Sequence, residues 1–363
     1  MRIYQKLRNN IDRGLISTLL LIILMGLLCL YSATRSVNPG IFTKQLLWLL
    51  IGLTSMVIFF AMDYRILKNI YWPLYLITVV LLACVLVFGR DIAGARRWFT
   101  FGHVSFQPSE LAKIVLVIWI ASYGSKKKGI QGYNIRDLIF PFVVILLPVA
   151  LILLEPDLGT AGIIILIATG LFLTIGIQGS SLVALTSMVA ISLPAGWLFL
   201  KDYQRKRILA FLDPTQDPLG SSYCTIQSKI AIGSGRLLGK GFLHGTQTQL
   251  RFLPEHHTDF IFSVVAEEWG FIGAGILVLL YLLLITKIIS IGTKAKDRFG
   301  ALVCFGIAIY FILHVFINIA MALGIIPVVG VPLPFISYGG SSLLVSMTCI
   351  GIVLSISWRR FIF

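Results

Sequence analysis

The densest group of acidic and histidine side chains stands where a polar stretch of the chain gives way to a long apolar one. Its members are Glu255, His256, His257, Asp259, Glu267 and Glu268. Two adjacent histidines cannot easily bind one ion from regular backbone, which disfavours zinc. A hard cation, Mg²⁺ or Mn²⁺, held by one carboxylate and substrate phosphates fits better, with Asp259 as a candidate ligand. Asp259 alternatively caps the next helix, a role compatible with catalysis because a cap holds a carboxylate at the helix rim.

A second candidate site combines two charges inside an apolar stretch with a basic, aromatic segment just before it. Glu110 and Lys113 stand three residues apart, so a helix places them on one face. Ionised groups in a membrane are costly unless they pair or face water, which makes this pair a functional candidate, with a self-neutralising structural pair as the alternative. Arg96 and Arg97 suit a phosphate, and Trp98 suits the membrane interface.

The glycine-rich segment 233–241 does not fit a nucleotide site. Ser234 stands where a Walker loop requires Gly, and Gly241 follows Lys240 where the loop requires Ser or Thr. The five cysteines show no CxxC spacing, and four of them fall inside apolar stretches. We therefore expect no nucleotide or organic cofactor, and cysteines that serve only for packing.

These candidate sites belong to a chain with the composition of an integral membrane protein. Of its 363 residues, 58% are hydrophobic and 12% are charged, whereas soluble domains carry about 25% charged residues. This excludes a water-soluble enzyme and predicts an all-α fold in which residues 1–363 form a single polytopic membrane domain. The ten apolar segments expected to be transmembrane helices are 14–33, 42–62, 71–89, 109–123, 138–155, 159–177, 180–200, 260–289, 299–323 and 339–357.

The net charge of +15 comes from basic residues in short tracts between these segments. No basic face has interleaved aromatic residues for base stacking, so nucleic acid is not an expected partner. Alternate sides of the membrane receive sixteen and five basic residues in their short segments, and eight more lie in the long stretch 201–258. Because cytoplasmic loops are enriched in Lys and Arg, we expect both termini in the cytoplasm.

The long stretch 201–258, between the seventh and eighth predicted helices, then faces outward. Loops of this length are usually functional or disordered, and this one carries too much pattern for disorder. Tyr223, Ile226 and Ile230 recur at helical spacing, which predicts a short amphipathic helix at the membrane interface. We expect this extracytoplasmic loop to carry part of the active site.

Several blocks of the chain have the residues and spacing of one known family. The most specific is a C-terminal signature made of Asn318, residues 324–330 (Gly-Ile-Ile-Pro-Val-Val-Gly) and residues 332–342 (Pro-Leu-Pro-Phe-Ile-Ser-Tyr-Gly-Gly-Ser-Ser). Further blocks are 94–98, 107–113, 155–160 and 254–260. On these blocks the chain resembles, over nearly its whole length, the SEDS family (shape, elongation, division and sporulation), which includes RodA, FtsW and SpoVE. Residues 239–247 and Glu155, where FtsW members typically carry Gln, resemble the RodA branch.

The resemblance implies a peptidoglycan glycosyltransferase in the bacterial cytoplasmic membrane. Such an enzyme polymerises lipid II into a growing glycan strand at the outer face, for cell elongation and shape. It implies as partners a class B penicillin-binding protein, which crosslinks the product, and other proteins of the elongation complex. In the inverting reaction, a base takes the proton from the 4-hydroxyl of the acceptor GlcNAc. That oxygen attacks the anomeric carbon of MurNAc while undecaprenyl pyrophosphate leaves.

The family's essential external aspartate falls on Asp259. A carboxylate with an ordinary pKa of about 3.9 is ionised at neutral pH and suits the base. The departing pyrophosphate needs cations, which Arg96, Arg97, Lys113 or a divalent ion would supply. The candidate substrate-binding residues are Arg96, Arg97, Trp98, Glu110, Lys113, Glu255, His257, Ser337 and Gly339.

Two other classes of function use some of the same features. A flippase or transporter of a lipid-linked precursor would use the charged pair and the broken segment near Ser337. Its polar groups would lie near the membrane midplane, whereas here they gather at the outer ends of helices. A scaffold that only recruits a synthase leaves the acidic cluster at residues 255–259 without a role.

The predicted orientation can be tested by cysteine accessibility. A cysteine placed near residue 240 should react with an impermeant maleimide added to intact cells, because this residue lies in the outward loop. One placed near residue 127 should react only after the membrane is opened. The reverse pattern would invert the topology.

Overall fold

A computed structural model describes residues 12–35, 39–92, 95–101, 104–126, 133–179, 181, 187, 205, 209–213, 220, 222–250 and 252–360. The described chain is mostly helical, as predicted. Eight of its helices are long and apolar enough to cross a membrane, and together they confirm a multi-pass membrane protein. They are α2 (Arg13–Arg35), α3 (Pro39–Ala61), α5 (Tyr71–Phe88), α7 (Ile135–Leu154), α8 (Leu158–Ile175), α13 (Ile261–Thr293), α14 (Arg298–Ala322) and α15 (Gly340–Arg359).

Two of the ten predicted spans are not among these eight helices. The fourth is present as helix α6 (Pro108–Lys126), which is buried along most of its length and carries Glu110 and Lys113 inside the bundle. The seventh, 180–200, lies outside the described residues except for positions 181 and 187. A further short helix, α4 (Tyr64–Asn69), is capped by the Asp63 carboxylate, which accepts a hydrogen bond from the N–H of Arg65.

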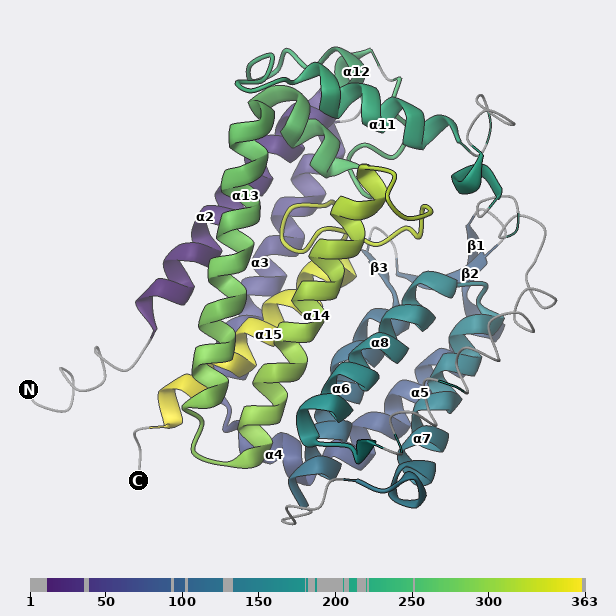
Figure 1. Cartoon of the computed structure of the whole chain (residues 1–363), viewed down its shortest axis with the longest axis vertical. Helices are drawn as coiled ribbons and strands as arrows, with labels where there is room; N and C mark the ends of the chain where they lie inside the picture. The colour runs from purple at the N-terminus through teal and green to yellow at the C-terminus, as the bar shows by residue number, and fades with distance from the viewer. Residues whose placement is uncertain are drawn as a thin grey trace, which may run out of the picture.

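The helices form two groups that meet along α6 and α14 (Figure 1). One group contains α2, α3, α13, α14 and α15, and the other contains α5, α6, α7 and α8. Helix α15 packs closely along α3 and is the most buried span, with 89% of its apolar window inside the protein. Because α15 is enclosed by its neighbours, the signature segment that leads into it is held inside the bundle.

A short antiparallel sheet connects α5 to α6, where an all-helical chain was expected. Its strands are β1 (Arg90–Ile92), β2 (Ala95–Phe101) and β3 (Val104–Phe106), in the order β1-β2-β3. Trp98 pairs with Arg90, and Phe99 pairs with Phe106. Aromatic and β-branched residues favour strands, but runs this short between two apolar helices give little periodicity to recognise.

The helix predicted in the long external loop is present as α11 (Tyr223–Ser234), but it buries a different face. Ser228 and Ala231 are buried, whereas Ile230 is 46% exposed. Ser228 Oγ is 2.7 Å from Ser263 Oγ and also donates to the Ala322 carbonyl. The small residues therefore let α11 pack on α13 and α14, and the placement of its exposed apolar residues at the membrane interface stays a prediction.

Helix α13 is broken at Gly270, where the turn after α11 passes close to it. Gly270 has φ 67° and ψ −165°, and a Cβ built there would lie 2.3 Å from the Gly239 nitrogen. The turn satisfies backbone groups on both sides of the break. Lys240 N donates to the Glu267 carbonyl (3.0 Å), and Phe271 N donates to the Arg236 carbonyl (2.8 Å). The external loop and the first part of α13 are thus joined through backbone hydrogen bonds.

The two ends of the described chain lie at the same end of the bundle. Helix α2 begins and α15 ends near the end that carries α4, and α11 with the short α12 (Thr246–Gln249) covers the opposite end (Figure 1). This arrangement agrees with termini on one side and the long loop on the other. Which side is the cytoplasm stays a prediction from the basic residues.

The break in α13 predicts a stability difference between two glycines of this helix. G270A should lower the melting temperature, because a non-glycine residue in this backbone region costs about 1–3 kcal/mol. G275A is the control, since a Cβ at Gly275 meets nothing within 4 Å and Ala is favoured over Gly in a helix. Thermal unfolding in detergent measures both. Equal melting temperatures would show that the break does not require glycine.

Candidate active site

Asp259 lies in the turn 254–260 at the entrance to α13, on the same end of the protein as α11. Helix α13 begins at Ile261 with Phe260 at the N-cap position, so Asp259 stands one residue before the cap. The capping alternative is therefore not what the structure shows. Asp259 is partly exposed and lines a pocket of about 230 Å³. The described residues around this pocket are Ala210, Phe211, Gly220, Ser222, Cys224, Thr225, Lys229, Glu255, Asp259, Phe260, Gly324, Pro327 and Val328.

Three successive carbonyls of this turn, at 257–259, are held by the C-terminal signature. The N–H of Tyr338 donates to the carbonyl of residue 257 at 2.9 Å. Ser337 Oγ donates to the carbonyl of residue 258 at 2.6 Å, and Asn318 Nδ2 donates to that of residue 259 at 2.9 Å. Asn318 Nδ2 also donates to the Val331 carbonyl at 2.7 Å. The signature thus fixes the backbone under Asp259, and the sequence-predicted Ser337 acts here by positioning.

Glu255 shapes the other side of the turn. Its φ is 51°, and its carbonyl accepts hydrogen bonds from the N–H groups of Thr258 (3.2 Å) and Phe260 (3.3 Å). Its carboxylate accepts the Thr258 hydroxyl at 3.1 Å. Glu255 and Asp259 both line the pocket described above, and their roles in binding substrate or a cation stay predictions.

The two histidines have different surroundings. His256 is buried, with Nδ1 2.7 Å from the Leu253 carbonyl and Nε2 2.9 Å from the Ala33 carbonyl, so both ring nitrogens are engaged in tying the turn to α2. His257 is half-buried beside Tyr338, and its Nδ1 has no hydrogen-bond partner among the described residues. Burial, reinforced by His256, lowers the pKa of His257. Within the described ranges no group of three His, Cys, Asp or Glu side chains is placed to hold a metal.

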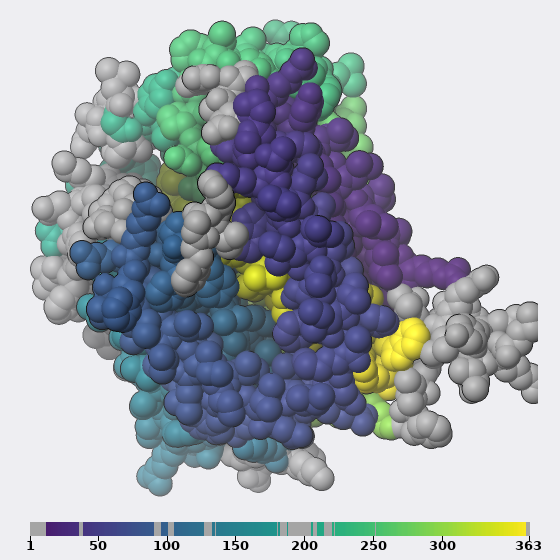
Figure 2. All heavy atoms as spheres, turned by 180° about the vertical axis from the view of Figure 1, so that it is seen from behind, coloured from purple at the N-terminus to yellow at the C-terminus, as the bar shows by residue number. Residues whose placement is uncertain are grey.

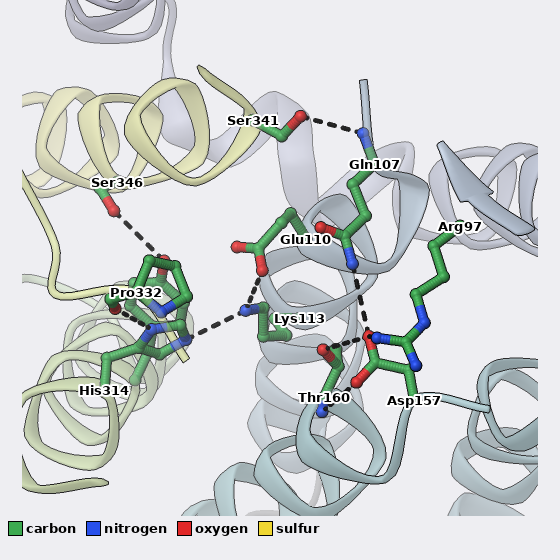
Figure 3. A network of polar contacts seen from close by, with 11 residues as sticks. Arg97, Gln107, Glu110, Lys113, Asp157, Thr160, His314, Pro332, Ser341 and Ser346 are labelled. Carbon is green, nitrogen blue, oxygen red and sulfur yellow. Dashed lines mark hydrogen bonds and ion pairs between the residues drawn. The ribbon is translucent and has the colours of Figure 1, made fainter. Parts of the chain in front are cut away.

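The charged pair on α6 is closed by a third residue that the sequence analysis did not identify. Lys113 Nζ lies 2.7 Å from Glu110 Oε1 and 3.0 Å from His314 Nε2 (Figure 3). Since the ammonium group donates to Nε2, the His314 proton is on Nδ1, which donates to the Pro332 carbonyl at 3.3 Å. His314 precedes Asn318 by one helical turn, and that spacing is the signal that a search for polar residues on one helix face would find.

This charged group is almost fully inside the protein. Lys113 is 1% exposed and Glu110 is 4% exposed. Their pairing compensates both charges, as buried ions require. The group holds the Pro332 carbonyl of the signature from one side, and Asn318 holds the neighbouring Val331 carbonyl. The two candidate sites of the sequence therefore meet at the same broken segment.

Arg97 is engaged with the turn between α7 and α8. Its guanidinium donates to the carbonyls of Glu155 (2.9 Å) and Pro156, and lies 3.9 Å from Asp157 Oδ2. Asp157 in turn caps α8 by accepting from Thr160 N at 3.1 Å. The side chain that the sequence assigned to phosphate binding thus supports the protein backbone.

The remaining predicted site residues are Arg96, Trp98 and Gly339. Seen from behind, yellow atoms of the C-terminal part are recessed between the purple and blue segments (Figure 2). Figure 3 also shows that the Gln107 N–H donates to Ser341 Oγ, at 2.9 Å. Gly339 N donates to Gln45 Oε1 at 3.4 Å. On strand β2, Arg96 is exposed and Trp98 is half-buried.

Glu155 is a buried carboxyl group in the turn before α8. It is fully enclosed, and neither of its side-chain oxygens has a hydrogen-bond partner among the described residues. Burial, reinforced by the charge of Asp157 and opposed by Arg97, raises the pKa of Glu155 to about 8. The group is therefore neutral at pH 7, which is the state that an isosteric Gln side chain imitates.

Glu267 and Glu268, at the start of α13, anchor the external loop. Glu267 Oε1 accepts hydrogen bonds from Lys240 Nζ (2.8 Å) and the Gln247 N–H (3.0 Å). Glu268 Oε1 accepts one from the Ser32 hydroxyl. These carboxylates belong to the structural support of the site.

The chain matches one family model and curated relatives over most of its length. A model described as cell cycle protein, for FtsW, RodA and SpoVE, matches residues 12–361. Peptidoglycan glycosyltransferase MrdB of Escherichia coli (strain K12) is 41% identical over 354 residues, which cover 97% of this chain and 94% of that protein. Probable peptidoglycan glycosyltransferase FtsW of Geobacter sp. (strain M18) is 38% identical over 349 residues, which cover 92% and 93%.

Two solved structures share the fold. One comes from work on structural coordination of polymerization and crosslinking by a peptidoglycan synthase complex, with a TM-score of 0.82, 34% identity, and 97% of this chain and 98% of that chain covered. The other is the crystal structure of the rod shape determining protein RodA of Thermus thermophilus, with a TM-score of 0.73, 30% identity, and coverage of 97% and 98%.

The buried Glu155 predicts a pH-dependent difference in stability. Its pKa in the folded protein is above the value of about 4.3 in an unfolded chain, so its contribution is lost as the pH rises from about 4.3 to 8. E155Q carries no such proton. Its melting temperature relative to the wild type should therefore increase from pH 5 to pH 8 in thermal unfolding. E255Q, which removes an exposed carboxylate, is the control, and a constant offset for E155Q would contradict the assignment.

Proposed function

The chain belongs to the cell cycle protein family of FtsW, RodA and SpoVE and is a membrane-embedded peptidoglycan glycosyltransferase, and we propose that it polymerises lipid II at the outer face of the cytoplasmic membrane during cell elongation. The observation that carries this proposal is the position of Asp259. Its backbone is fixed by the signature, and its side chain faces a pocket at the end of the protein covered by α11.

Asp259 acts as the general base. Its carboxylate takes the proton of the acceptor 4-hydroxyl, and the acceptor oxygen forms a bond to the anomeric carbon of the donor sugar. The bond from that carbon to the diphosphate breaks, and its electron pair goes to the phosphate oxygen. Attack opposite the leaving group inverts the anomeric configuration. Asp259 then returns its proton to water.

The pocket residues also fit a divalent cation. Glu255 and Asp259 line the same pocket, and Mg²⁺ is typically bound by one or two carboxylates together with substrate phosphates. Bound there, Mg²⁺ or Mn²⁺ would neutralise charge on the diphosphate. Glu255 would hold the ion from the rim, since its φ of 51° turns this residue away from the regular backbone path.

The buried group of Glu110, Lys113 and His314 serves a different purpose. Because Lys113 is already compensated by Glu110 and hydrogen-bonded to His314, it holds the signature in place through Pro332. In this position it joins α6 to α14, one helix from each of the two groups. Arg96, exposed on β2, remains accessible to a head group.

The partner we propose is a class B penicillin-binding protein that crosslinks the new strand. A structural relative with 34% identity comes from a peptidoglycan synthase complex that coordinates polymerization and crosslinking. Both termini are proposed to lie in the cytoplasm, which places α11 and the Asp259 turn on the side where such a partner acts. Other proteins of the elongation complex would join the same assembly.

The transporter alternative finds less support in the site. Alternating access needs polar groups that open to each side in turn. Here Glu110 and Lys113 are enclosed and compensated, and Asp259 lies beyond the N-terminus of α13 at one end of the protein.

The assignment of the base predicts the effect of D259N. The amide keeps the size of the side chain and the backbone hydrogen bond from Asn318, so the protein should fold and bind its partner. The loss of general-base catalysis should reduce polymerisation about 100- to 10,000-fold. Glycan products from lipid II, made by the purified chain alone and with the penicillin-binding protein, measure this. E255Q should lose less activity.

Near-normal polymerisation by D259N would remove Asp259 from the role of base. If a histidine variant, H257A, abolished activity instead, the proton acceptor would have to be sought at that residue. Folding of each variant is checked by its elution as a single species and its melting temperature.

A further inference from the structure

The Asp259 pocket contains one basic side chain, and no sequence motif pointed to it. Among the lining residues that the structure describes, Lys229 of α11 is the one cation, facing a pocket that also contains Glu255 and Asp259. A diphosphate brought next to two carboxylates meets repulsion unless a cation lies close by. The pocket therefore needs a positive charge for the proposed substrate, and Lys229 is positioned to supply it.

Three other basic residues of the candidate sites are occupied by other contacts, and Arg96, which is exposed, does not line this pocket. Lys113 is bound by Glu110 and His314, Lys240 pairs with Glu267 at 2.8 Å, and Arg97 holds the turn at residues 155–157. Lys229, by contrast, is exposed and makes no ion pair with any carboxylate in the described part of the chain. Its charge is available to a ligand.

The backbone after α14 makes room for this lysine. Gly324 has φ 66°, and a Cβ built there would lie 2.2 Å from Lys229 Cε and 2.6 Å from Nζ. The lysine stem thus lies directly over Gly324, the first glycine of the C-terminal signature. Apolar stems of lysine commonly pack on such a surface while the ammonium group stays with polar ligands. Gly324 and Lys229 form one contact at the edge of the pocket.

The other walls suit the remainder of a lipid-linked sugar. Thr225 supplies a hydroxyl group on the α11 side, whereas the Ser222 hydroxyl donates to the Ala210 carbonyl at 3.3 Å. Pro327 and Val328 supply an apolar wall from the signature. A phosphate is bound well by an ammonium group together with hydroxyl donors. The chemistry of this pocket is therefore that of a diphosphate bonded to a sugar.

We propose that Lys229 binds the diphosphate of the lipid-linked donor and neutralises the charge that develops on it as it leaves. This inference rests on the proposed polymerisation of lipid II. When the anomeric bond breaks, its electron pair moves to the diphosphate oxygen, and the ammonium group of Lys229 stabilises that oxygen. The proton of the acceptor goes to Asp259, so the lysine keeps its own protons throughout.

Polymerisation kinetics test this role with matched variants. K229M should lower kcat about 100-fold, since removal of one charge-stabilising donor typically costs about 100- to 1,000-fold. K229R should retain most of the activity, because a guanidinium also binds phosphate. R236M is the control, since Arg236 is an exposed cation in the turn just after α11 that does not line this pocket. If K229M and R236M polymerise equally well, the inference is wrong.

A second measurement does not depend on polymerisation. Cys224 lines the same pocket, and its labelling by a maleimide can be followed in a C84S background, because Cys29, Cys304 and Cys349 are buried. Inorganic pyrophosphate should slow labelling in this background and in R236M, but not in K229M. If pyrophosphate does not slow the labelling of Cys224 in the chain that keeps Lys229, the proposed site is wrong.

The two measurements separate failure of the inference from failure of the proposed function. If the wild-type chain does not polymerise lipid II, alone or with its penicillin-binding partner, the proposed function is refuted. The protection of Cys224 would then still show whether Lys229 binds pyrophosphate. A wild-type chain that polymerises, with K229M unchanged in both measurements, would refute the inference alone.

Discussion

The turn that carries Asp259 depends on hydrogen bonds to its backbone from a segment more than 50 residues later in the chain. Three consecutive carbonyls in this turn precede the N-cap of α13 and so have no partner within the helix, and leaving them unpaired inside a membrane protein is costly. Asn318, Ser337 and Tyr338 supply the donors. The conformation of the long C-terminal signature, with its many glycines and prolines, places those donors at one short turn.

The same segment is held from its other side by a charged group. His314 donates to the Pro332 carbonyl and accepts from Lys113, which pairs with Glu110. Burying two ions is expensive and stabilises little by itself, so such groups are better understood as fixing one arrangement among several. Here they fix the distance between α6, α14 and the signature. The packing of the two helix groups and the Asp259 pocket therefore both depend on the C-terminal signature.

The sequence was sufficient to predict features that depend on residues close together in the chain. It was not sufficient to predict contacts between residues that are far apart in the chain. Apolar length identified the eight helices of the described residues that could cross a membrane, and the acidic turn and the Glu110–Lys113 pair stood out because charges are rare in such a chain. Neither the contact between Lys113 and His314 nor the use of Arg97 on backbone carbonyls follows from spacing, since both contacts join segments far apart in sequence. The face that α11 turns to the protein was not predicted for a related reason. Periodicity draws attention to the larger apolar residues, whereas close helix approach uses Ser228 and Ala231.

The break at Gly270 also sets how deep in the membrane the chemistry occurs. Beyond the break, residues 271–293 rise about 34 Å at about 1.5 Å per residue, which is enough to cross a hydrocarbon core of about 30 Å unaided. Residues 261–269, the part of α13 before the break, are therefore not needed for this crossing. Asp259 contacts Asn318, one turn before the end of α14, so the carboxylate stands near the end of the helix bundle rather than beyond it. A polyprenyl chain can thus remain dissolved in lipid while its sugars, which are insoluble there, reach the base.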